Sequence, residues 1–293
     1  MAALVEKAPA KINLTLDVVG RRADGYHDVV SIMLPIELHD TVRLKESRGL
    51  LPGEIMVVCE DPAVPRGRQN LVYQAARLLM EGLNLKPGVG VEITIEKSIP
   101  MAAGLAGGSA DAAAVLRGLN RMWKLGLSDR ELQKLGSRLG ADVPFCLFNR
   151  PALARGKGEV LTPIRVKGTL WFLLAKGPYV VATAEVYRRY DQMEVKSRPR
   201  LIPMLQALEE GAVSRVGALL CNVLEPVTTH LYPQVKELKR LILSTKCPGA
   251  AMSGSGPSVF GVARNEDEAR EAADTLLASA TTPIWQIVTC TIS

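Results

Sequence analysis

The sequence is poor in the residues that build metal centres and disulfide frameworks. Its 293 residues include only three histidines and five cysteines. The cysteines are odd in number, widely spaced and without a CxxC pair, which indicates buried thiols in a reducing compartment rather than a zinc site. The histidines are isolated, so we expect no metal held by the protein alone. Ser109 and Ser255 lie in no GxSxG elbow, which argues against a serine hydrolase.

Aromatic residues and long apolar runs are also scarce. Aromatic side chains make up 4% of the chain, too few for an RNA-binding surface that interleaves basic residues with base-stacking rings. The longest apolar stretch near the middle, Leu170 to Ala175, is far shorter than the roughly 20 residues of a membrane-spanning helix. Glu6, Lys7 and Pro9 precede any apolar run, so no export signal is visible. We therefore expect a soluble, cytoplasmic protein.

Length and charge set the frame for what is present. With 47% hydrophobic and 23% charged residues the composition is that of an ordinary globular protein. The length favours two closely packed domains, and we place the boundary near residue 160, giving domains 1–160 and 161–293. The net charge of +6 suits an anionic ligand such as a nucleotide, but it also suits nucleic acid or an acidic surface.

Periodicity predicts an α+β fold. Ile12, Leu14, Leu16 and Val18 alternate with polar residues, which predicts a half-buried strand with Lys11 and Asn13 on its polar face. Further strands are expected at 29–38, 41–44, 54–58, 89–95 and 170–175. Helices are expected at 71–82, 112–120, 182–191, 201–210 and 232–244, with two more beginning at the caps Ser128 and Asn265. Strands precede helices, which favours the α+β class.

A glycine-rich loop lies between the strand that ends near Glu96 and the alanine-rich helix. Glycines let the backbone come close to a ligand, and the helix adds unpaired amides, so phosphate is the natural occupant. The loop has neither the Walker A sequence nor the dinucleotide GxGxxG pattern. A turn that needs glycine only for close packing is the alternative. A second glycine-rich turn, with Gly254, Ser255 and Gly256, could close over the same site or merely connect strands.

Four side chains outside these loops are candidates for chemistry or binding. Lys11 is either a solvated edge charge or a fixed cation beside a phosphate. Asp142, between Gly140 and Pro144, is either a turn former or a partly desolvated base for a substrate hydroxyl. Tyr26 and His27 form an exposed-looking pair after a turn and could stack on a base or sugar, although core packing is the alternative.

Together these segments resemble the GHMP kinase superfamily over nearly the whole chain. The resemblance rests on five stretches, namely Pro9 to Leu14, Arg22 to His27, Pro100 to Asp111, Gly140 to Pro144 and Ser253 to Pro257. It implies a two-domain α+β fold, with a ribosomal-protein-like amino-terminal domain, a carboxy-terminal α/β sandwich and an active site in the interdomain cleft. The Asp-Gly-Tyr-His stretch with Gly-Ala-Asp-Val-Pro points within the superfamily to kinases of a cytidine diphosphate polyol.

The activity that the resemblance implies is transfer of the γ-phosphate of ATP, accompanied by Mg2+, to a tertiary hydroxyl of that polyol in isoprenoid precursor biosynthesis. Asp142 would accept the hydroxyl proton, and Lys11 would hold the oxyanion and keep Asp142 ionised. Asn13 would orient the polyol, with Tyr26, His27 and Tyr187 around the cytosine. The nucleotide would be bound by Pro100, Met101, Ala102, Ala103, Gly104, Leu105, Ala106, Gly107, Gly108, Ser109 and Ala110, with Asn70 and Lys97 at the adenosine end.

Two other functions remain open from the residues alone. A kinase of another small alcohol, such as homoserine or mevalonate, would share the glycine loop and differ at Tyr26 and His27. A non-enzymatic RNA-binding module would explain the basic middle of the chain. We expect ATP and a small-molecule substrate as partners, no nucleic acid or membrane, and a monomer or homodimer.

Overall fold

The computed structural model describes residues 3–85 and 88–292. Its contacts divide the chain into two compact units. The first is drawn from 1–10, 38–101 and 106–149, and the second from 11–37, 102–105 and 150–293. Each unit is built from separate stretches of the chain, since the two long strands β1 (Leu4–Arg21) and β2 (His27–Ser47) each contribute residues to both. The expected domains 1–160 and 161–293 follow chain order instead, and that division stays a prediction.

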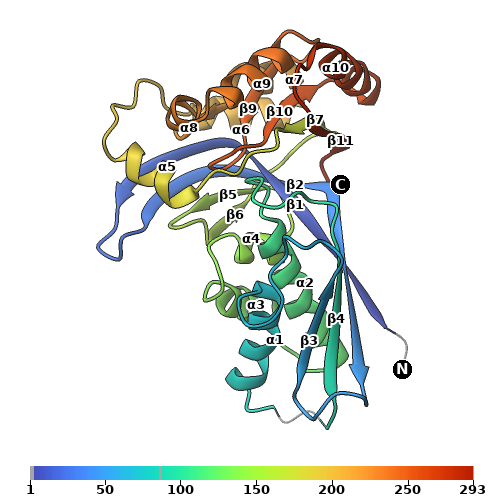
Figure 1. Cartoon of the computed structure of the whole chain (residues 1–293). Helices are drawn as coiled ribbons and strands as arrows, with labels where there is room; N and C mark the ends of the chain where they lie inside the picture. The colour runs from blue at the N-terminus through green and yellow to red at the C-terminus, as the bar shows by residue number, and fades with distance from the viewer. Residues whose placement is uncertain (1–2, 86–87, 293) are drawn as a thin grey trace. The chain divides into compact units, whose positions relative to one another are not determined.

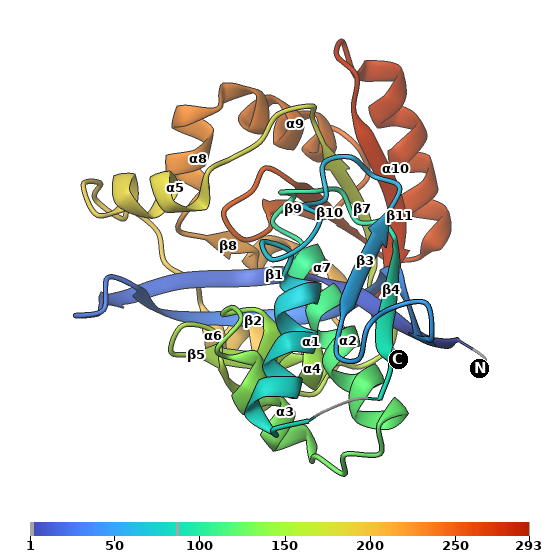
Figure 2. The same cartoon turned by 60° about the horizontal axis from the view of Figure 1, so that its bottom comes forward.

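The first unit packs four helices against a sheet. Strands β3 (Ile55–Cys59) and β4 (Gly90–Glu96) pair in parallel, and β4 pairs antiparallel with β2 from Thr41↔Glu96 to Ser47↔Gly90. The helices are α1 (Leu71–Gly82), α2 (Gly107–Met122), α3 (Asp129–Gly136) and α4 (Val143–Phe148). Helices α1 and α2 lie side by side in Figures 1 and 2. Their buried alanines and the apolar face of β4 share one core.

Local capping chemistry sets two of these helices. The Asn70 side chain accepts from the Val72 amide at 2.8 Å, so α1 begins where the sequence predicts and has the predicted bounds. The Ser128 and Glu131 capping box predicted for α3 is present, but the helix ends at Gly136 and not near Gly140. Helix α2 begins at Gly107, five residues before the predicted start. The prediction assigned Gly107 and Gly108 to a loop because glycine is a poor helix former.

The second unit contains a four-stranded antiparallel sheet of order β11-β7-β10-β9. The strands are β7 (Trp171–Lys176), β9 (Gly249–Met252), β10 (Val259–Ala263) and β11 (Trp285–Cys290). Helices α7 (Val213–Leu219), α9 (Pro233–Leu243) and α10 (Glu266–Ser279) pack against this sheet. Asn265 caps α10 by accepting from the Glu268 amide at 2.8 Å, as predicted.

The remaining elements of the second unit extend the sheet of β1 and β2 and add three helices. Strand β2 pairs antiparallel with β5 (Ala152–Arg155), which pairs with β6 (Val160–Pro163), and β1 pairs in parallel with the short β8 (Cys221–Asn222). Three further helices are α5 (Thr183–Tyr190), α6 (Leu201–Glu210) and α8 (Glu225–Leu231). No helix within residues 3–85 and 88–292 is long and apolar enough to cross a membrane.

The two long strands differ from their predictions. The apolar face of β1 is buried as expected, but Lys11 and Asn13 on its polar face are only 4% and 3% exposed, so the half-buried description is wrong. Partners distant in the sequence satisfy these polar groups, which allows both faces to be covered. The predicted strands 29–38 and 41–44 are one strand, β2, because the polar residues between them, His39 and Asp40, do not interrupt it.

Candidate active site

The phosphate-loop candidate ends in an uncapped helix. Ala106, the residue before α2, has the left-handed conformation (φ 60°, ψ 26°), and no side chain in the described part of the chain caps the helix. The first backbone amides of α2 are therefore left for a ligand, with the positive end of the helix dipole behind them. Gly107 also has little space beside it, since an added Cβ would lie 3.1 Å from the Ile99 side chain.

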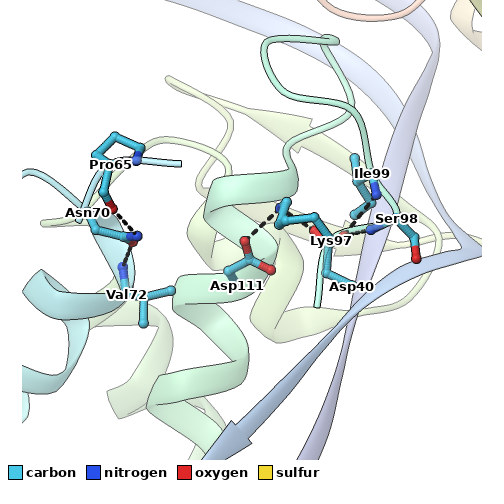
Figure 3. Close-up of polar contacts among 8 residues, drawn as sticks. All are labelled: Asp40, Pro65, Asn70, Val72, Lys97, Ser98, Ile99 and Asp111. Atoms are coloured by element: carbon cyan, nitrogen blue, oxygen red, sulfur yellow. Dashed lines mark hydrogen bonds and ion pairs between the residues drawn. The ribbon is translucent and has the colours of Figure 1, made fainter. Parts of the chain in front are cut away.

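A buried ionic trio lies at the start of this helix. The Lys97 ammonium donates to the Asp111 carboxylate at 2.8 Å and to the Asp40 carboxylate, and Figure 3 shows it between the two. Asp40 also accepts from the amides of Ser98 and Ile99 at 2.6 and 2.8 Å. Asp40 therefore ties the segment after β4 to β2, and Lys97 ties it to α2.

The trio carries one positive and two negative charges when fully ionised. Burial alone lowers the pKa of Lys97, but the attraction of Asp111 and Asp40 outweighs it and raises that pKa. Burial raises the pKa of Asp111 to about 7, with Lys97 opposing the rise and Asp40 adding to it. The second carboxylate oxygen of Asp111 is buried and has no hydrogen-bond partner among the described residues. Burial thus makes the Asp111 carboxyl group easier to protonate than an ordinary aspartate.

Asn70 and Lys97, predicted at the adenosine end, both have structural partners in the first unit. Besides capping α1, the Asn70 amide donates to the Pro65 carbonyl at 2.8 Å, and Figure 3 draws this contact in the same view as the trio. An added Cβ on Gly107 would lie 3.4 Å from the Lys97 nitrogen, which places Lys97 beside the first residue of α2. Their contact with adenosine stays a prediction.

Asp142 occupies the position before α4, a short helix that sequence reasoning missed. Its backbone is helical (φ −84°, ψ −15°), Pro144 lies in the first turn, and the Asp142 side chain makes no capping hydrogen bond. Within residues 3–85 and 88–292, its carboxylate takes part in no hydrogen bond or ion pair. A carboxylate without such a commitment is available to a substrate hydroxyl.

Lys11 and Asn13 begin a chain of hydrogen bonds inside the second unit. The Lys11 ammonium donates to the Asn13 side chain at 2.7 Å and to the Gly104 carbonyl at 3.2 Å. Asn13 donates to the Ser31 hydroxyl at 2.8 Å, and Ser31 donates to the Thr15 carbonyl at 2.6 Å. Lys11 is therefore buried and its side chain is oriented by hydrogen bonds. The alternative prediction of a solvated charge at a strand edge is wrong.

The second glycine turn packs against the first glycine loop. The Ser253 hydroxyl donates to the Gly104 carbonyl at 3.0 Å. A Cβ on Gly104 would lie 2.4 Å from the Ser253 carbonyl oxygen, and one on Gly254 would lie 3.3 Å from the Lys11 nitrogen. Both glycines have left-handed backbones, with φ of 74° and 58°. Glycine is therefore required at both positions, and the turn lies next to Lys11.

The third group of candidates gathers on the second unit beside α5. The rings of His27 and Tyr187 stack with centroids 4.8 Å apart, and the His27 ring hydrogen-bonds the Asp191 carboxylate at 2.7 Å. The His27 side chain is only 8% exposed, so the exposed description was wrong for it, whereas Tyr26 is 58% exposed. The Lys157 ammonium lies 4.3 Å above the Tyr26 ring. His27 and Tyr187, predicted together, thus lie together.

Several polar residues of these clusters escaped sequence reasoning. Asp111 directly follows the predicted loop, and Asp40 lies between two predicted strand segments, where a fully buried carboxylate needs a partner. Ser31 and Asp191 gave no such signal. Asp191 is separated from His27 by 164 positions, so only the folded chain reveals the pair.

Comparisons with known proteins identify the family of the chain. The family model described as GHMP kinases N terminal domain matches residues 70–150, and GHMP kinases C terminal matches 204–280. The 4-diphosphocytidyl-2-C-methyl-D-erythritol kinase of Alkaliphilus metalliredigens is 46% identical over 270 residues, covering 92% of this chain and 91% of that protein. The kinase of the same name from Geobacillus thermodenitrificans is 47% identical, covering 89% and 88%. The chain belongs to the 4-diphosphocytidyl-2-C-methyl-D-erythritol kinase family.

Solved structures place this kinase family within a wider fold. A crystal structure of 4-(cytidine 5'-diphospho)-2C-methyl-D-erythritol kinase is similar with a TM-score of 0.80 and 34% identity, covering 99% of this chain and 100% of that one. The homoserine kinase of Cytophaga hutchinsonii has a TM-score of 0.76 at 18% identity, a likeness that shows the fold alone. The GHMP kinase fold expected from the sequence is therefore confirmed.

Proposed function

We propose that this chain transfers the γ-phosphate of ATP to the 2-hydroxyl group of 4-diphosphocytidyl-2-C-methyl-D-erythritol, a step of non-mevalonate isoprenoid precursor biosynthesis. The observation that carries the proposal is the 46% identity to a kinase of that name along nine-tenths of both chains. The GHMP fold alone is shared with kinases of other alcohols and does not choose between them.

Asp142 is the general base in this mechanism. A tertiary alcohol is a weak nucleophile, so its proton must pass to an acceptor as the bond to phosphorus forms. Two features support Asp142, namely its position between the end of one helix and the proline-bearing start of another, and its lack of any capping hydrogen bond. An uncommitted carboxylate accepts a hydroxyl proton without first breaking another contact.

Lys11 supplies fixed positive charge to the reacting oxygen. Its ammonium is oriented by Asn13 and by the Gly104 carbonyl, so it needs no reorganisation when negative charge develops. A buried ammonium acts in a medium that screens charge weakly, which makes it more effective than a solvated one.

ATP binds along the loop Pro100 to Ala110. The uncapped amides at the start of α2 are suited to the phosphate oxygens. Mg2+ arrives bound to those phosphates as part of the substrate and neutralises their charge. Because the Lys97 ammonium is committed to two carboxylates, we assign it the task of fixing the segment before the loop, with any contact to adenosine made from that position.

The cytidine end of the alcohol lies against His27 and Tyr187. Their stacked rings form a flat aromatic surface, and Asp191 holds the His27 ring in one orientation. Tyr26, which is exposed and covered on one side by Lys157, is free to close over a bound base. Flat rings at this site favour a substrate that carries a nucleobase over homoserine or mevalonate.

A substrate panel tests the proposal. Purified protein is incubated with ATP and Mg2+ and with either 4-diphosphocytidyl-2-C-methyl-D-erythritol, homoserine or mevalonate, and ADP release is followed by a coupled assay. We expect turnover only with the cytidine diphosphate alcohol. Preferential turnover of homoserine or mevalonate overturns the specific proposal but keeps the kinase, whereas salt-sensitive RNA binding with no ADP release overturns both.

A further inference from the structure

Asn222 holds the second glycine turn by two adjacent hydrogen bonds. Its side-chain amide donates to the Met252 carbonyl at 2.8 Å and to the Gly254 carbonyl at 2.7 Å. These carbonyls flank Ser253, whose hydroxyl donates to the Gly104 carbonyl. Asparagine matches this pair of acceptors, because its short side chain ends in an NH2 group with two hydrogen-bond donors.

Asn222 is itself fixed from two sides. It lies on β8, opposite Leu16 of β1 in a parallel pair. Its side-chain oxygen accepts from the Leu224 amide at 2.9 Å, and the residue is only 6% exposed. Both ends of the amide are therefore engaged, and the donors are aimed at the turn from a strand that pairs with the strand of Lys11.

The turn is held at a second point by α8. The Thr228 hydroxyl donates to the Ser255 carbonyl at 3.1 Å, and the Ser255 hydroxyl hydrogen-bonds that of Thr183 at 2.7 Å. Thr228 is fully buried. Asn222 and Thr228 thus bind the carbonyls of Gly254 and Ser255, at the part of the turn that lies next to Lys11.

We propose that Asn222, assisted by Thr228, is a positioning residue for phosphoryl transfer. It acts through the turn, because Ser253 and the Lys11 ammonium share one acceptor, the Gly104 carbonyl. An added Cβ on Gly254 would lie 3.3 Å from the Lys11 nitrogen, so a displaced turn disturbs Lys11 directly. The inference rests on the proposed function of Lys11 and concerns its orientation, not substrate recognition.

The first variant is Asn222→Asp. The carboxylate keeps the size and the acceptor for the Leu224 amide but, when ionised, offers no donor to the two carbonyls of the turn. We expect kcat to fall by about tenfold or more, since a misplaced charge loses transition-state stabilisation. The KM for the alcohol should stay within about threefold of the wild-type value, because His27 and Tyr187 are untouched.

A matched control separates positioning from general destabilisation. Asn120 in the first unit also bridges a backbone segment, donating to the Leu127 carbonyl at 2.9 Å and accepting from its amide at 3.0 Å. Asn120→Asp removes the same kind of donor from a different loop. Circular dichroism first checks that Asn222→Asp and Asn120→Asp are both folded. The kcat of Asn120→Asp should then stay within about twofold of the wild-type value.

Thr228 keeps the proposal testable if Asn222→Asp does not fold. Thr228→Val removes the hydroxyl at nearly constant shape and should lower kcat. Thr228→Ser keeps the hydroxyl that donates to the Ser255 carbonyl, so its kcat should stay close to the wild-type value. A kcat of folded Asn222→Asp within about twofold of wild type overturns the proposal, as does equal loss in Asn120→Asp or in both Thr228 variants. Failure of the proposed function would be distinguishable from failure of this inference, because the wild-type enzyme would then give no turnover of the cytidine diphosphate alcohol in the substrate panel.

Discussion

Replacing Asp111 by asparagine should remove most of the pH dependence that the ionic trio gives to stability. Burial raises the pKa of Asp111 to about 7 from its ordinary value of 3.8, with Asp40 adding to the rise against the attraction of Lys97. Between these two values the folded state binds more protons than the unfolded state. The free energy of unfolding therefore falls as pH rises through this window and levels off above the folded pKa.

The size of the effect follows from linkage. For one group with these two pKa values, the free energy of unfolding falls by about 3 kcal/mol between about pH 5 and about pH 8. The asparagine side chain of the variant does not ionise, and the Lys97 ammonium would keep a single anionic partner, Asp40. The stability of Asp111→Asn relative to wild type should therefore rise by that amount across the window, whatever constant cost the substitution carries.

Urea unfolding followed by circular dichroism at several pH values measures this difference. Asp274→Asn is the matched control, because Asp274 is exposed on α10 and belongs to no ion pair among the described residues. Its stability relative to wild type should not vary over the same range. A constant difference between wild type and Asp111→Asn would refute the reasoning, since Asp111 would then have the same ionisation in the folded and unfolded chain.

Three further substitutions test separate parts of the site. Asp142→Asn should bind ATP but lose about 100- to 10,000-fold in kcat, and near-normal turnover of the variant would remove Asp142 as the base. Tyr187→Leu loses the stack on His27, so the KM for the cytidine diphosphate alcohol should rise about tenfold with kcat little changed; an unchanged KM in steady-state assays would exclude cytosine from this surface. Gly254→Ala places a Cβ 3.2 Å from the Gly104 carbonyl at a φ of 58° and should lower the free energy of unfolding by about 1–2 kcal/mol, whereas equal urea midpoints would show that the turn adapts.

Local chemistry made part of the fold predictable from the sequence. The bounds of α1, the cap of α3 and the cap of α10 all follow from side chains that bond amides two or three positions along the chain. Such contacts are written in the sequence because both partners lie in one short window. The same locality explains why Ser128 and Asn265 predicted helix starts well.

Long-range pairing made the rest inaccessible. A solvated edge charge was one expectation for Lys11 on the polar face of β1, yet besides Asn13 its ammonium has a partner in the Gly104 carbonyl, 93 positions away. Lys97 similarly pairs with Asp40 across 57 positions, and His27 with Asp191 across 164. No pattern within one segment encodes such pairs, so the sequence could nominate Lys11, its neighbour Asn13 and His27, but not the distant Gly104 carbonyl and Asp191 carboxylate that also orient them.

Identifying the phosphorylated product tests most directly whether the phosphoryl group reaches the 2-hydroxyl. Phosphorus NMR of the reaction of 4-diphosphocytidyl-2-C-methyl-D-erythritol with ATP should show one new phosphomonoester on that oxygen, formed in step with ADP. The signal should be lost with Asp142→Asn. A phosphoester on another hydroxyl, or ADP formed with no phosphoester, would contradict the proposed reaction.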